Sequence, residues 1–80
     1  MPRFYFDVKN STAATVDDEG VDFEAFEEAK EAAIRELVSI IKDEVPDGER
    51  LSYVVTVRDE EKTPVYVATG MIMGETLSRE

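Results

Sequence analysis

The sequence contains neither cysteine nor histidine. Without cysteine there is no disulfide framework, no thiol nucleophile and no thiolate zinc site. Without histidine there is no side chain that shuttles protons near neutral pH or serves as the base for a nucleophilic serine or threonine. No glycine-rich stretch fits a phosphate-binding loop. We therefore expect no enzymatic activity, no metal site and no cofactor.

Basic residues are also scarce. Nine lysines and arginines stand against nineteen aspartates and glutamates, which gives a net charge of −10, and no two basic residues are adjacent. Because nucleic-acid affinity depends mainly on attraction between basic side chains and phosphates, such a chain would be repelled by DNA or RNA. We expect no nucleic-acid partner, and we interpret the acidic surface as a source of solubility.

Long hydrophobic runs are missing as well. No apolar stretch approaches the roughly 20 residues of a membrane-spanning helix, and residues 1–4 lead directly into a strand pattern without the layout of a signal peptide. With 80 residues, of which 42% are hydrophobic, the chain is long enough for one small core. The sequence predicts one cytoplasmic domain over residues 1–74, with a frayed tail over residues 75–80.

Four segments have the composition of β-strands. Residues 3–8 and 51–58 alternate apolar and polar side chains, as half-buried strands do. Residues 12–16 form a weaker pattern, which predicts an edge strand. Residues 65–73 are apolar at almost every position, and Gly70 within them is expected at a bulge or at a close approach of another segment.

The segment between the strands at residues 12–16 and 51–58 predicts a helix. Asp22 is the expected N-cap, and Val21 and Phe26 have the spacing of a hydrophobic staple. The helix is expected to end near Glu44 or Val45, before the turn residues 46–48. One apolar stripe recurs at steps of three and four residues: Phe26, Ala29, Ala33, Leu37, Ile40 and Ile41.

This order of elements, β-β-α-β-β, predicts an α+β fold. Short connections make the first two strands and the last two strands antiparallel neighbours. Placing the third strand beside the first gives the order 2-1-3-4 for the strands counted along the chain, with every pair antiparallel and the weak second strand at an edge. One helix covers one face of this four-stranded sheet and leaves the other face open.

Several segments together are similar to a family of short bacterial proteins of unknown function. Its members begin M-P-R-[YF]-[YF]-F-D and carry a later V-R-D-E-x-G-x-P-V segment. Lys62 stands where that segment usually has glycine. The resemblance implies a compact, stand-alone domain and brings no activity, substrate or cofactor. The matching residues are 1–8, Asp18-Glu19-Gly20, 29–33, 57–60 and Pro64-Val65.

Asp7 and Arg58 form a possible polar site. Strand interiors disfavour aspartate, so Asp7, between Phe6 and Val8, needs an explanation. One interpretation is a recognition or catalytic acid on the open face. The other, which we favour, is a cross-strand partner for Arg58 or Arg3.

Two acidic clusters are the other candidates for chemistry, Asp17-Asp18-Glu19 and Asp59-Glu60-Glu61. Carboxylates at loop tips can bind calcium or magnesium. Neither cluster has the spacing of a calcium-binding loop, and both adjoin turns, where acids are common for solvation and local hydrogen bonds. We favour the structural interpretation.

The strongest functional signal is apolar surface that one helix cannot cover. The strand at residues 65–73 has apolar residues on both faces, and an exposed apolar edge strand favours pairing with another chain. We therefore expect a non-catalytic interaction module that forms a homodimer or binds a protein partner. The alternatives are a protein that binds a small ligand or cation through its acidic turns, and an acidic inhibitor of a basic partner. The expected interface residues are Tyr5, Val54, Val65, Val67, Met71 and Met73.

Overall fold

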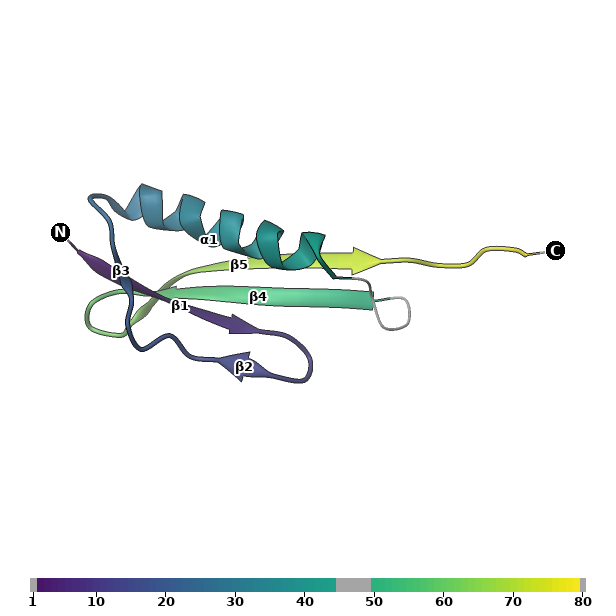
Figure 1. The fold of residues 1–80 in the computed structure, drawn as a ribbon, viewed down its shortest axis with the longest axis horizontal. Coiled ribbons are helices and arrows are strands. Elements are labelled where there is room, and N and C mark those ends of the chain that lie inside the picture. The colour runs from purple at the N-terminus through teal and green to yellow at the C-terminus, as the bar shows by residue number, and fades with distance from the viewer. Residues whose placement is uncertain (1, 45–49, 80) are drawn as a thin grey trace.

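A computed structural model describes residues 2–44 and 50–79 (Figure 1). One helix packs on one face of an antiparallel sheet, so the fold is mixed α+β, as predicted. The sheet has five strands rather than four, in the order β2-β1-β4-β5, and β3 also pairs with β1. The elements are β1 (Arg3–Lys9), β2 (Ala14–Thr15), β3 (Val21–Asp22), α1 (Phe26–Lys42), β4 (Arg50–Arg58) and β5 (Pro64–Met73).

The strand register explains where the core lies. Phe6 lies opposite Val57, and Val57 lies opposite Tyr66 on the next strand. Because side chains alternate along a strand, this row and every second row above and below it face the helix. The buried core combines these rows with the helix, and its members are Phe4, Ala29, Ala33, Leu37, Val55, Val57 and Ala68.

The helix lies over β4 and β5 (Figure 1). Gly70 is a point of close approach, since a Cβ atom there would lie 2.5 Å from Cδ1 of Ile41 and 3.2 Å from Cγ of Leu37. The sheet has no bulge at Gly70, which pairs regularly with Tyr53. The irregularity lies instead between Val57 and Arg58. Of the two roles predicted for Gly70, the close approach is therefore confirmed.

The predicted start of the helix is wrong. The helix begins at Phe26, and its N-cap, Ala25, makes no side-chain capping hydrogen bond. Asp22 belongs to β3, where it lies opposite Arg3. Its carboxylate accepts two hydrogen bonds from the Arg3 guanidinium, at 2.9 and 3.3 Å. Asp22 thus pairs with a residue 19 positions earlier in the chain, and this strand pairing replaces the expected helix cap and hydrophobic staple.

The other boundaries differ less. The helix ends at Lys42, slightly before the predicted Glu44 or Val45, and Val45 lies outside the described residues. The expected strand over residues 12–16 is reduced to Ala14–Thr15. Residues 74–79 are exposed and contain neither helix nor strand. In the part of the chain that the structure describes, no helix is both long enough and apolar enough to cross a membrane.

The turn between β4 and β5 places Lys62 in a left-handed conformation, with φ of 68°. The Asp59 carboxylate holds this turn by accepting the N–H groups of Glu61 and Thr63, at 2.9 and 3.0 Å. A side chain at positive φ is disfavoured because its Cβ atom crowds the backbone, whereas glycine has no such cost. Glycine would adopt this backbone angle at position 62 without that cost.

We expect Lys62→Gly to raise the free energy of unfolding by about 0.5–1 kcal/mol, because the relief of the left-handed backbone outweighs the greater chain entropy of glycine. Urea unfolding of the parent and the variant measures the difference. Lys62→Ala is the matched control, because it removes the ammonium but keeps the Cβ atom. A glycine variant no more stable than the alanine variant would contradict this explanation.

Candidate functional site

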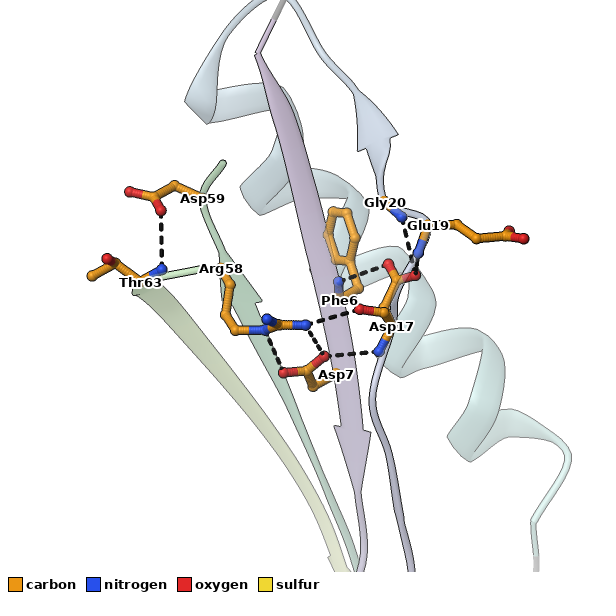
Figure 2. Close-up of polar contacts among 8 residues, drawn as sticks. All are labelled: Phe6, Asp7, Asp17, Glu19, Gly20, Arg58, Asp59 and Thr63. Atoms are coloured by element: carbon orange, nitrogen blue, oxygen red, sulfur yellow. Dashed lines mark hydrogen bonds and ion pairs between the residues drawn. The ribbon is translucent and has the colours of Figure 1, made fainter. Parts of the chain in front are cut away.

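Asp7 and Arg58 form a two-pronged ion pair across β1 and β4 (Figure 2). Arg58 donates from Nε to Oδ2 of Asp7 at 2.7 Å and from Nη2 to Oδ1 at 3.0 Å. Their side chains are only 24% and 16% exposed, respectively. The hydrogen bond to Asp7 raises the pKa of Arg58, although partial burial opposes this. The predicted polar pair is thus brought together across two strands, and of the two partners considered for Asp7 it is Arg58 that binds it, while Arg3 binds Asp22.

A third residue, Asp17, connects this pair to the outer edge of β1. Arg58 also donates from Nη2 to the backbone carbonyl of Asp17, at 2.8 Å. The Asp17 N–H donates to Oδ1 of Asp7, at 3.0 Å. The Asp7 carboxylate therefore accepts hydrogen bonds from both neighbours, and the segment between β2 and β3 is tied to the centre of the sheet.

The Asp17 side chain takes the place of a strand along part of β1. Its Oδ2 accepts the N–H of Phe6 at 3.0 Å, and its Oδ1 accepts the N–H groups of Glu19 and Gly20 at 3.0 and 3.1 Å (Figure 2). Partial burial disfavours the charged form, but these three donors and the nearby charge of Arg58 hold the pKa of Asp17 below its usual value. The carboxylate fills the gap in pairing between β2 and β3.

Sequence reasoning placed Asp17 in a solvated acidic cluster and did not find this role. The sequence did indicate a turn that ends at Gly20. In the structure Gly20 has φ of 74°, and its N–H donates to the Asp17 carboxylate. The bonds to Phe6 and Asp7 depend on how the chain folds back over ten or eleven residues, which no local pattern records. The described residues contain no group of three or more acids arranged to hold a metal ion.

Tyr5 lies on the open face with two cations near its ring. The guanidinium carbon of Arg58 is 5.3 Å from the ring centroid, and Nζ of Lys62 is 4.3 Å from it. Cations over an aromatic face are attracted to it, more strongly where water is excluded. Of the expected interface residues, Tyr5 and Val54 are half-buried on this face, so the exposed part of the surface lies elsewhere, on β5.

β5 is the long edge strand of the sheet, and most of its apolar residues are exposed. Its outward residues on the open face are 56% exposed at Val67 and 57% at Met71. On the helix side, Ile72 is also exposed, so the strand is apolar on both faces, as the sequence predicted. Residues 63–74 carry no charged side chain in a protein of net charge −10. The predicted interface residues Val65, Val67, Met71 and Met73 all lie here, exposed.

The hydrogen bond to Asp17 also fixes which backbone groups β5 presents. Phe6 turns its N–H away from β4, so Phe6 and its partner Val57 exchange no backbone hydrogen bonds. Val57 therefore points its N–H and C=O toward β5. Its partner on β5, Tyr66, points its own N–H and C=O back toward β4. Since this direction alternates along a strand, the residues that point outward from the edge are Val67, Thr69, Met71 and Met73.

No curated protein and no solved structure matches this chain. A family model described as a domain of unknown function, DUF6894, matches residues 3–71. That range includes the Asp7, Asp17 and Arg58 cluster and most of β5. The chain therefore belongs to the DUF6894 family of domains of unknown function.

Proposed function

We propose that this protein is a non-catalytic interaction module that self-associates through β5 and the adjoining open sheet face. The observation that carries the proposal is the edge strand itself. β5 has no strand on its outer side among the described residues, it is apolar on both faces, and it is uncharged. Natural edge strands are usually protected by charges, prolines or a covering segment. Among the described residues β5 has only Pro64, at its start, and such an edge favours pairing with another chain.

The polar cluster supports a structural role better than a catalytic one. Both Asp7 oxygens accept hydrogen bonds from Arg58, and both Asp17 oxygens accept backbone N–H groups. Groups whose hydrogen-bonding capacity is used within the fold have less left for a substrate or a cation. The Asp59 carboxylate is similarly engaged within its turn. These contacts favour the interaction module over a ligand-binding protein.

Electrostatics make the expected association dependent on salt. Two copies that each carry a charge of −10 repel one another, while the β5 surface contributes no charge of its own. Added salt screens the repulsion between the acidic surfaces and leaves the hydrophobic attraction in place. The dimer should therefore tighten as the salt concentration rises.

Analytical ultracentrifugation tests the proposal. We expect the parent to dimerise, and Val67→Lys to weaken the dimer at least tenfold because it places a charge on the apolar edge. Val16→Lys is the matched control. Val16→Lys changes the net charge by the same amount. Val16 is 68% exposed and lies outside β5, so this variant should leave the dimer unchanged. A parent that stays monomeric at hundreds of micromolar, in both low and high salt, would refute self-association.

A further inference from the structure

We infer that the partner is a second copy whose β5 pairs antiparallel with the first, about a two-fold axis beside Thr69. The inference rests on the proposed self-association and specifies its geometry. The strands of the two copies then form one continuous sheet, with both helices on the same side. The alternative is that two open faces stack on one another.

The free backbone groups of β5 suit this arrangement. Val67, Thr69 and Met71 all point their N–H and C=O groups away from β4, as derived above from the bond between Phe6 and Asp17. About a two-fold axis, Thr69 lies opposite its own copy and Val67 lies opposite the partner's Met71. These are hydrogen-bonded pairs, and the three pairings supply roughly six backbone hydrogen bonds.

The side chains in this register are also compatible. On the open face, each exposed valine meets an exposed methionine, and the two threonines meet at the axis. Apolar and β-branched residues directly opposite one another stabilise a strand pair. Thr63 to Gly74 contain no charge, so the pairing brings no like charges into contact along the strand.

The position of the helix allows a second contact across the axis. α1 lies over β4 and β5. A helix centred between these strands is one strand spacing from the axis, so the two helices lie two spacings, or about 10 Å, apart. This distance matches the 8–10 Å at which helices commonly pack. The two layers of the fold would therefore continue together across the interface.

The helix flank that faces the axis carries apolar side chains at the level where the two helices would meet. Two residues mark the ends of this flank. Lys30 lies over the ring of Tyr66, and Ile41 lies next to Gly70. Ile34 and Val38 occupy the same flank between these two points, because residues four apart lie one above the other on a helix. They are 43% and 58% exposed, so a large part of their apolar surface is left uncovered in a single copy.

The apolar area available at this edge approaches that of a standard dimer interface. The seven apolar residues around this edge, with exposures between 38% and 65%, present on the order of 600 Å² per copy, against roughly 800 Å² per partner in a standard interface. Backbone atoms of the edge add to this area. The residues are Ile34, Val38, Val65, Val67, Met71, Ile72 and Met73.

Stacking of the open faces is less favourable for a reason visible in Figure 2. The Asp7–Arg58 ion pair lies on the open face, and Lys9 and Arg50 lie on the same face by alternation. Stacking would remove these charged groups from water, which is costly even for paired charges. Edge pairing leaves the solvent exposure of all four as it is in a single copy.

Single-cysteine variants test the geometry, because the natural chain contains no cysteine. In Thr69→Cys the two Cα atoms face one another at about 5.5 Å, within the range of a disulfide. We expect mild oxidation to give a covalent dimer. Met71→Cys is the control on the same edge and face. Its two copies lie about 13 Å apart along the strands, too far for a bridge, so it should remain monomeric on a non-reducing gel.

Hydrogen exchange on the unmodified protein provides the second measurement. At concentrations where the dimer forms, the N–H groups of Val67, Thr69 and Met71 should exchange at least tenfold more slowly than in dilute, monomeric protein. A dimer by ultracentrifugation that leaves these amides unprotected and Thr69→Cys unbridged would overturn edge pairing and leave self-association intact. Bridging of Met71→Cys in place of Thr69→Cys would overturn the register. A monomer under all conditions would refute both proposals.

Discussion

Leu37→Ala should lower the free energy of unfolding by about 2–5 kcal/mol, the largest effect we expect from one substitution. Leu37 is 5% exposed, belongs to the same buried cluster as Ala33, and lies against Gly70 of β5. Removing its branched end forfeits hydrophobic transfer energy and leaves a cavity that Ala33 and Gly70 are too small to fill. Denaturant unfolding monitored by circular dichroism measures the change.

Glu31→Ala is the matched control on the same helix. Its side chain is 69% exposed and lies 3.9 Å from the Arg35 guanidinium, a surface ion pair of the kind that contributes little. We expect a change within about 0.5 kcal/mol. Equal unfolding midpoints for the two variants would contradict the assignment of the buried helix face.

The second large effect is expected at Asp17. Replacing it with alanine removes the acceptor for three backbone N–H groups, those of Phe6, Glu19 and Gly20. With about 1 kcal/mol for each lost hydrogen bond, and more for bonds to a charged group, we expect a loss of about 2–4 kcal/mol. The neighbouring substitution Asp18→Asn should have almost no effect, since Asp18 is exposed. Urea unfolding of both variants measures this contrast.

The effect of Asp17 should also depend on pH. Its pKa in the folded protein is lowered, mainly because backbone donors overcome the opposing effect of partial burial. A carboxyl whose folded pKa lies below the unfolded value of about 3.9 contributes its stability above that value and loses it as the pH falls through the folded pKa. The stability difference between parent and Asp17→Ala should therefore shrink below about pH 4. A difference that stays constant down to pH 2 would contradict this role.

The longer elements could be predicted because their patterns are local and repeated. β1, β4 and the buried stripe of α1 each repeat one period over at least seven residues, and β5 is a nearly continuous apolar run of similar length. The two-residue strands β2 and β3 are too short to show a period. Asp22 is of a residue type that caps helices, but in the fold its carboxylate binds the Arg3 guanidinium and its backbone pairs with β1, and the N-cap is Ala25.

The candidate polar site was predictable in part for the same reason. Asp7 and Arg58 lie on long strands whose faces follow from alternation, so their meeting required only the correct strand order. Asp17 lies in an irregular segment, and its bonds to Phe6 and Asp7 depend on the path of that segment. The acid run and Gly20 indicate a turn, but they do not indicate that one carboxylate will satisfy a strand amide.

Asp17 has a further consequence for how far assembly can proceed. A sheet with two open edges can add copies at both ends without limit, as cross-β fibres do. Here the other edge consists only of the two-residue strands β2 and β3, with the Asp17 carboxylate between them along β1, which leaves β5 as the one long edge open to another strand among the described residues. Pairing of that edge with its copy consumes both open edges at once. Growth then terminates at two subunits, and removal of the Asp17 carboxylate would expose a new starting point for polymerisation.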